Sequence, residues 1–171
     1  WKEANIFTPQ QQEGEPFAMV FPPANVTGVL HLGHALTVAI QDIIVRFRRM
    51  QGFRTLYIPG TDHAAIATQA KVEAELYKKE KKTRRDFSRE EFLKLVEQYA
   101  ANSQATILDQ LKQLGASVDW SRLAYTLDEK RTLAVRTAFM RLFEQGLIYR
   151  GSRLVNWDPK LSTTVSDIEI E

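Results

Sequence analysis

The chain has 171 residues, enough for one domain or slightly more, with 44% apolar and 26% charged residues. Its formal net charge of +2 is too small to indicate nucleic-acid binding by itself. It contains no cysteine, which excludes disulfides and thiolate zinc sites. No apolar run approaches the roughly 18 residues of a membrane span.

The first half of the chain predicts alternating strands and helices. Residues 1–14 are expected to form a short helical entry and a polar loop, and residues 17–21 a buried strand. A helix follows and ends at Gly52, and a second strand covers residues 55–58. The helix is indicated by apolar side chains at helical spacing: Leu36, Ile40, Ile43, Ile44 and Phe47. With a further helix over 64–77, this order predicts a parallel α/β sheet.

Residues 78–146 predict an added helical segment. It opens with the charge run Lys78–Arg85, which is expected to be a solvated connector, or alternatively a contact to RNA. Ser88 and Glu91 form a capping box for a helix that ends at Gly115.

The last quarter of the chain predicts one more helix and two strands. Thr126 and Glu129 repeat the capping-box spacing, and Gly146 is expected to end that helix. Residues 147–149 and 154–157 are then predicted to be strands around a Gly-Ser turn.

Two of the three histidines, His31 and His34, follow the first predicted strand in the stretch PPANVTGVLHLGH. Ligands of open α/β sheets bind at the carboxyl ends of strands, and a helix start offers free N–H groups to anions. Gly33 would let a ligand approach the backbone closely. Imidazoles placed there could donate hydrogen bonds to phosphate oxygens as negative charge develops.

The spacing of these histidines is open to two other interpretations. They could be half of a metal site, which would need a third ligand such as His63. They could also be ordinary histidines that only support the start of a helix.

The third histidine follows the second predicted strand, in Pro59–His63. All three histidines therefore lie at strand ends of one predicted sheet, together with Asp62. Asp62 could cap the next helix, or it could face the cleft and pair with a cationic group of a ligand.

These blocks resemble a known family. HLGH at 31–34 resembles the HIGH motif of class I aminoacyl-tRNA synthetases. Within that class, four blocks are similar to those of valyl-tRNA synthetases and occur in the same order: PPANVTG at 22–28, PGTDHAAIATQ at 59–69, LGASVDWS at 114–121 and NWDPKL at 156–161. Isoleucine and leucine relatives usually carry an aromatic residue or Trp in the corresponding blocks.

The resemblance implies a Rossmann-type parallel sheet, with residues 1–171 as the first half of a class I catalytic domain that ends about where the editing domain begins. It implies ATP-dependent activation of valine to valyl-adenylate and transfer to tRNA(Val). The expected substrates are L-valine, tRNA(Val) and ATP with Mg²⁺. No zinc and no membrane partner are expected, and the expected location is cytoplasmic.

The resemblance also assigns roles to residues. His31 and His34 should contact ATP phosphates and act in catalysis, and Gly28 and Gly33 should leave room for the nucleotide. The residues expected to bind valine are Asp62 at the amino group, Asn25 nearby, and Pro22 and Pro23 as a pocket wall. Further residues that could line the cleft are Thr61, His63, Gln69, Trp157 and Asp158.

The sequence departs from the family pattern in places. Ala24 and Ala65 stand where many relatives have proline and glycine, which should adjust the loops only slightly. The second ATP motif, KMSKS, is absent from these residues, so the isolated chain is expected to activate little or no valine. The alternatives are a fragment of an isoleucyl or leucyl enzyme, an H-x-G-H nucleotidyltransferase, and a non-catalytic module that binds nucleotide or RNA.

Overall fold

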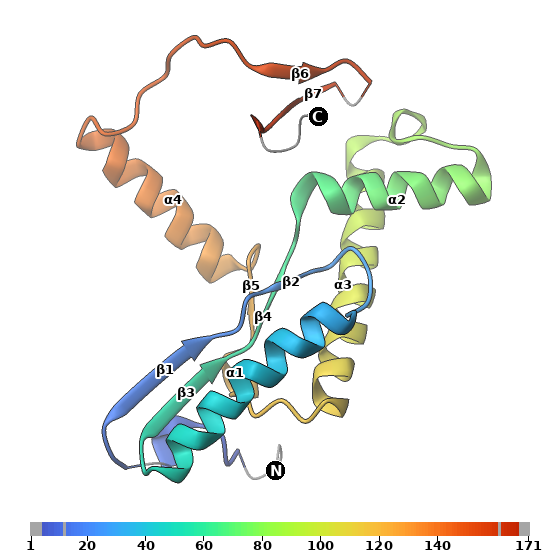
Figure 1. Cartoon of the computed structure of the whole chain (residues 1–171). Helices are drawn as coiled ribbons and strands as arrows, with labels where there is room; N and C mark the ends of the chain where they lie inside the picture. The colour runs from blue at the N-terminus through green and yellow to red at the C-terminus, as the bar shows by residue number, and fades with distance from the viewer. Residues whose placement is uncertain (1–4, 12, 161, 168–171) are drawn as a thin grey trace. The chain divides into compact units, whose positions relative to one another are not determined.

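The computed structural model describes residues 5–11, 13–160 and 162–167. The chain forms two compact units, Trp1–Thr132 and Leu133–Glu171, and each is described by itself. Figure 1 shows the elements of both. None of the helices in the described residues combines the length and the hydrophobicity of a membrane-spanning segment.

The first unit is built on two parallel strands joined by a helix. Strands β1 (Pro16–Val20) and β3 (Arg54–Ile58) pair in parallel, with Phe17 opposite Thr55 and Met19 opposite Tyr57. Helix α1 (Leu32–Met50) connects them and packs against both strands. The predicted strand, helix, strand order is therefore confirmed, and a short 3₁₀ helix, η1 (Pro9–Gln11), precedes it.

Three very short strands extend this arrangement, and the sequence did not predict them. β2 (Ala24–Asn25), β4 (Gly60–Asp62) and β5 (Ala124–Tyr125) form a second parallel sheet in the order β2-β4-β5. The prolines before β2 and β4 predict the ends of strands. Proline lacks an N–H and interrupts a ladder, but the chain resumes pairing beyond the prolines, as the bond from the Val26 N–H to the Asp62 carbonyl shows.

Two packed helices lie between β4 and β5 in the chain. Helix α2 (Ala65–Glu80) contacts α3 (Arg89–Gln113), and the 3₁₀ helix η2 (Arg84–Asp86) lies between them in sequence. The predicted capping box is confirmed, because the Ser88 hydroxyl accepts the Glu91 N–H and the Glu91 carboxylate accepts the Ser88 N–H. A further 3₁₀ helix, η3 (Trp120–Arg122), leads into β5.

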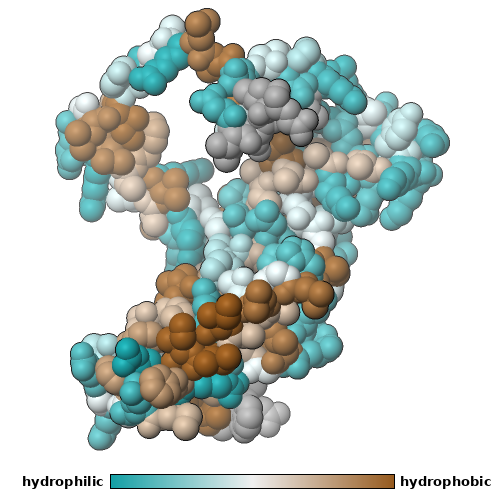
Figure 2. Space-filling view, in the orientation of Figure 1, coloured by the Kyte–Doolittle hydropathy of each residue, from teal (hydrophilic) through white to brown (hydrophobic). Residues whose placement is uncertain are grey.

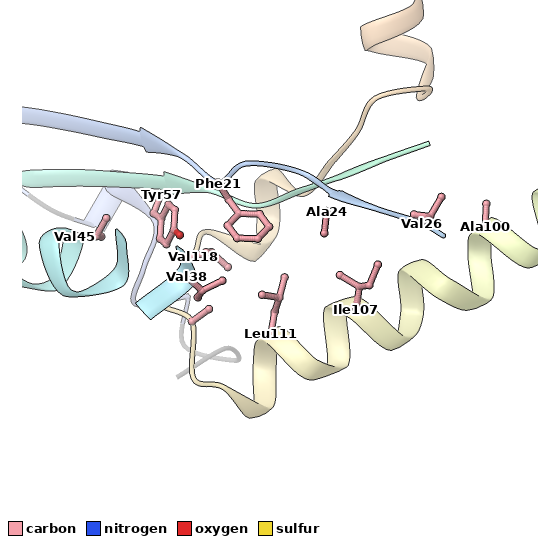
Figure 3. Packing of buried hydrophobic residues seen from close by; sticks show 11 residues of the cluster. Phe21, Ala24, Val26, Val38, Val45, Tyr57, Ala100, Ile107, Leu111 and Val118 are labelled. Carbon is pink, nitrogen blue, oxygen red and sulfur yellow. The ribbon is translucent and has the colours of Figure 1, made fainter. Parts of the chain in front are cut away.

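The core of the first unit lies between the strands, α1 and α3 (Figure 3). Its central side chains come from β1's end, α1, β3 and α3, and include Phe21, Val38, Tyr57, Ile107 and Leu111. The Tyr57 hydroxyl donates to Oε1 of Gln41 at 2.8 Å. Burial, and secondarily the charge of Asp42, raises the pKa of Tyr57 to about 12.

The apolar spacing predicted α1 correctly but not which of its faces packs. Val38, Asp42 and Val45 are buried, whereas the apolar side chains that indicated the helix stay exposed: Leu36, Ile40, Ile43, Ile44 and Phe47. Figure 2 shows a hydrophobic patch over the region of α1. The prediction of a buried strand at residues 17–21 holds for Phe21, which is buried, but is wrong for Ala18 and Val20, which are exposed. Helix α1 packs against one side of the β1-β3 sheet, and nothing comparable covers the other side among the described residues.

Helix α4 (Glu129–Glu144) begins at the end of the first unit, and its cap differs from the prediction. The Arg131 N–H donates to Oδ1 of Asp128 at 2.9 Å, so Asp128 caps the helix. Thr126 is engaged elsewhere, with Asp62 and His63. The predicted capping box of Thr126 and Glu129 is therefore wrong.

The second unit continues from α4 to a small hairpin. Strands β6 (Asn156–Asp158) and β7 (Thr163–Val165) pair antiparallel, with Trp157 opposite Thr164. The strand predicted at 154–157 thus begins two residues later and ends one residue later. Residues 147–149 form no strand, which corrects that prediction, because no described segment pairs with them.

Candidate active site

His31 and His34 form a capping box at the start of α1. Nδ1 of His31 accepts the Gly33 N–H at 3.1 Å, and Nδ1 of His34 accepts the His31 N–H at 3.2 Å. The two ring centroids lie 4.0 Å apart, with the rings tilted by 44°. Two imidazoles therefore take the place of the Ser and Glu side chains that usually make such a box.

The capping box determines which ring nitrogen of each histidine carries the proton. A neutral imidazole has one N–H donor and one acceptor, and both Nδ1 atoms are acceptors here. Each neutral ring therefore carries its proton on Nε2. Burial, and secondarily the nearby His31, lowers the pKa of His34. His34 thus remains a neutral Nε2–H donor over a wider pH range than an unperturbed histidine.

Gly33 is required by the packing of His31. A Cβ atom at position 33 would lie 2.9 Å from Cε1 of His31, closer than Cβ contacts normally are. Any larger residue would push the His31 ring out of its bond with the Gly33 N–H. Gly28, in contrast, has no heavy atom within 4 Å of its Cβ position, so the backbone is open there.

Asp62, His63 and Thr126 form a hydrogen-bonded cluster at the ends of β4 and β5. Oδ1 of Asp62 accepts the Ala64 N–H at 3.0 Å and the Thr126 hydroxyl at 3.0 Å. The Thr126 hydroxyl also lies 2.6 Å from Nδ1 of His63. Asp62 does not cap α2, because the N-cap residue is Ala64, in the left-handed conformation at φ 49° and without a side-chain cap.

Helix α3 supports both loops through polar side chains that the sequence did not single out. Oε1 of Gln110 accepts the Leu30 N–H at 2.9 Å, and the Tyr99 hydroxyl donates to the Thr27 carbonyl at 3.0 Å. Nε2 of Gln104 donates to the fully buried Thr61 hydroxyl at 2.6 Å. These bonds tie the loop before the histidines, and the strand before Asp62, to one rigid helix.

The structure brings five predicted site residues together at the ends of β2 and β4: Pro23, Asn25, Thr61, Asp62 and His63. Asn25 lies directly opposite Asp62 in the β2-β4 register. A small pocket of about 100 Å³ is lined by Pro23, Thr61 and Thr126 among others. Pro22 is exposed beside it in sequence, and Gln69 is half-buried on α2. Trp157 and Asp158 lie on β6 of the second unit, so their place in the cleft stays a prediction.

Within the described residues, no group of three or more His, Asp or Glu side chains could hold a metal ion. The Nδ1 atoms of His31 and His34 are occupied by backbone N–H groups. Only their Nε2 atoms remain for a ligand.

A parallel α/β sheet with a histidine pair at a strand-to-helix turn is the arrangement expected of a domain that binds an anionic ligand at the ends of its strands. The family model of class I tRNA synthetases, which covers the isoleucine, leucine, methionine and valine enzymes, matches residues 1–171, and the chain belongs to this family.

Among the individual relatives, valine–tRNA ligases are similar to the chain over nearly all of its length. The chain is 54% identical over its full length to the valine–tRNA ligase of Protochlamydia amoebophila, and 55% identical over 98% of its length to that of Thermus thermophilus. It spans 18% and 19% of those proteins, about a fifth of their length.

A solved structure shares the fold. The LeuRS of Agrobacterium radiobacter K84, in a ternary complex with tRNA and LeuAMS, matches 98% of this chain with a TM-score of 0.78 and 22% identity. The match covers 20% of that chain. At this level of identity it supports the Rossmann-type class I fold and no more.

Proposed function

We propose that the chain is the N-terminal catalytic part of a valine–tRNA ligase, where it binds ATP and valine for the formation of valyl-adenylate. The valyl group would then be transferred to tRNA(Val). The observation that carries this proposal is the His31–His34 capping box, which leaves both Nε2–H groups as donors at a strand-to-helix turn of a class I synthetase chain.

In the proposed reaction, the valine carboxylate attacks the α-phosphorus of ATP, and pyrophosphate leaves. Negative charge develops on the phosphate oxygens, and His31 and His34 donate hydrogen bonds to it. A preorganised donor of this kind contributes roughly 2.7–4 kcal/mol to transition-state stabilisation. ATP would enter as its Mg²⁺ complex, and the open backbone at Gly28 would leave room for the nucleotide.

Valine would bind near the ends of β2 and β4, where Asn25 lies opposite Asp62. Oδ1 of Asp62 is already held by two donors, so Oδ2 is the oxygen left to accept from the substrate ammonium. Asn25 lies opposite Asp62 and would assist. Pro22 and Pro23 would form one rigid wall of the side-chain pocket, and Pro23 lines the small pocket already present.

Identity supports valine over the other amino acids of the family. Five valine–tRNA ligases from different species are 51–54% identical to the chain over all or nearly all of its length. The leucine enzyme with the same fold is 22% identical. The proposal carries with it tRNA(Val) as the partner and a cytoplasmic location, where charged tRNA serves translation.

The test is ATP–pyrophosphate exchange by the complete ligase that carries this segment. We expect exchange that depends on valine and is much weaker with isoleucine or leucine. His34→Ala should reduce it at least tenfold, because a donor to the developing charge is lost. Thr106→Val, which removes a hydroxyl on an exposed part of α3, is the matched control and should leave exchange unchanged.

Two results would contradict the proposal: exchange that prefers another amino acid, or a loss far below tenfold in His34→Ala. For the isolated 171-residue chain we expect little or no exchange. Calorimetry then separates an incomplete catalytic site from a binding module. Binding of ATP and valine supports the former, and RNA binding without either supports the latter.

A further inference from the structure

Thr126 contacts Asp62 of the proposed valine site and its neighbour His63, which lie 64 and 63 positions away in sequence. It directly follows β5, which pairs in parallel with β4, so that Thr61 lies opposite Tyr125. The Thr126 N–H donates to the Thr61 carbonyl at 3.2 Å and continues this pairing. The backbone ladder therefore places the Thr126 side chain beside Asp62 and His63.

The hydroxyl of Thr126 has three polar neighbours. Its oxygen lies 3.0 Å from Oδ1 of Asp62, 2.9 Å from the backbone N of His63 and 2.6 Å from Nδ1 of His63. A threonine hydroxyl has one proton and two lone pairs. The carboxylate can only accept, so the proton goes to Asp62. The two lone pairs then accept from the His63 backbone N–H and from Nδ1–H of the His63 ring.

This proton arrangement has two consequences for the site. Oδ1 of Asp62 is filled by Thr126 and the Ala64 N–H, which fixes the plane of the carboxylate and leaves Oδ2 for a ligand. The neutral His63 ring carries its proton on Nδ1, so its Nε2 is an acceptor. His31 and His34 are in the opposite state, with Nε2–H donors.

The hydroxyl is needed because Asp62 and His63 do not hydrogen-bond directly. Nδ1 of His63 lies 3.4 Å from Oδ1 of Asp62, which is long for a hydrogen bond between these groups. Thr126 bridges the gap with shorter contacts to both.

We propose that Thr126 is a positioning residue for amino-acid activation. Its hydroxyl orients the Asp62 carboxylate toward the substrate ammonium and holds His63 with Nε2 as an acceptor for the same polar end of the amino acid. This inference rests on the proposed function and adds to it a residue that acts through Asp62 and His63.

The experiment compares Thr126→Val with Thr126→Ser in the complete ligase. Valine keeps the shape and removes the hydroxyl, whereas serine keeps the hydroxyl. We expect Thr126→Val to raise the KM for valine by about ten- to a hundredfold, the range for losing a hydrogen bond to a charged group. The KM for ATP should change less than twofold, and Thr126→Ser should restore most of the valine affinity. Thr106→Val is again the control and should change neither constant.

Two further measurements separate positioning from a loss of folding. L-valinol carries the ammonium and the isopropyl group but cannot be activated, and its dissociation constant should rise in Thr126→Val as the KM for valine does. In the double variant Asp62→Asn with Thr126→Val, the KM for valine should rise by less than the product of the two single effects, because part of the hydroxyl's effect passes through the carboxylate.

The inference is overturned if Thr126→Val raises the KM for valine and the KM for ATP equally, or if Thr126→Ser restores none of the valine affinity. It is also overturned if the effects of Asp62→Asn and Thr126→Val on the KM for valine multiply in the double variant as independent effects would. The failure of the proposed function looks different. In that case the unaltered ligase would show no valine-dependent exchange, and Asp62→Asn would have no effect on valine. If Asp62→Asn weakens valine binding and Thr126→Val does not, the positioning role of Thr126 is contradicted and the proposed function is not.

Discussion

The His31 backbone N–H donates to the ring of His34, while the His31 ring accepts from the Gly33 N–H. The two histidines therefore begin α1 and orient each other at the same time. This requires a separation of three residues, since a capping box joins the N-cap and the third helical residue. It also requires glycine at position 33, where a Cβ would collide with the His31 ring.

The titration of His34 is the first prediction. Burial is the larger cause of its lowered pKa and the His31 charge the smaller. NMR titration of the histidine rings should therefore give His34 a pKa below 6.5. His31→Asn keeps a cap acceptor and removes the charge, so it should raise the His34 pKa by the smaller part of the shift. Complete recovery in His31→Asn would mean that charge, and not burial, dominates.

The same shift predicts how stability depends on pH. Between the lowered pKa of folded His34 and 6.5, the unfolded chain binds more protons than the folded one. The contribution of His34 to the free energy of unfolding should therefore fall as pH drops through that window and level off below it. Urea denaturation at several pH values should show that the free energy of unfolding depends less on pH in His34→Asn than in the unaltered chain. If the free energy of unfolding depended equally on pH in both proteins, the lowered pKa of His34 would not be its cause.

The cap of α4 is the third prediction. Hydrogen bonds from the backbone, first from Arg131, lower the pKa of Asp128. Asp128→Ala should lower the thermal midpoint at pH 7, whereas Glu129→Gln should change it far less. The advantage of Asp128 over Asp128→Asn should be present above the usual pKa of 3.8 and disappear as pH falls through the lowered value. If Glu129→Gln lowered the thermal midpoint more than Asp128→Ala does, the helix would be capped by Thr126 and Glu129 instead of by Asp128.

Packing gives a fourth prediction with a matched pair of isoleucines. Ile107 on α3 is 1% exposed, and Ile43 on α1 is 67% exposed. Ile107→Ala should destabilise the first unit by about 2–5 kcal/mol, because it leaves a cavity in the core. Ile43→Ala should change the free energy of unfolding of the same chain by about 0.5 kcal/mol or less. Equal losses would mean that the exposed stripe of α1 packs against something.

The charge run Lys78–Arg85 gives a fifth prediction. Its residues are mostly exposed, and Lys82 pairs locally with Glu80 at 2.7 Å. We expect alanine at all six basic positions to leave adenylate formation and the salt dependence of tRNA affinity unchanged: Lys78, Lys79, Lys81, Lys82, Arg84 and Arg85. Each lost phosphate contact would reduce the slope of log affinity against log salt by about 0.7–0.9. A reduction of that size would show that the run contacts RNA.

Much of the local structure could be predicted because its causes are local. The cap at Ser88 and Glu91 and the start of α1 depend on residues within four positions of each other. Hydrophobic spacing located α1, but it could not tell which apolar side chains pack, since that depends on where the sheet lies. The short strands beyond the prolines were missed because their pairing partners, not their own residues, make them strands.

The sequence by itself determined the order of the main elements and the two strand-to-helix turns that carry all three histidines and Asp62. Only the tertiary structure decided what surrounds them. Parallel pairing of β4 with β5 brings Thr126 to Asp62, and α3 reaches the loops through Tyr99, Gln104 and Gln110. These contacts join residues 43 to 80 positions apart. The spacing of residues along the chain cannot predict these contacts. Parallel strands are joined by long crossover connections, so their residues become neighbours only when the whole sheet forms.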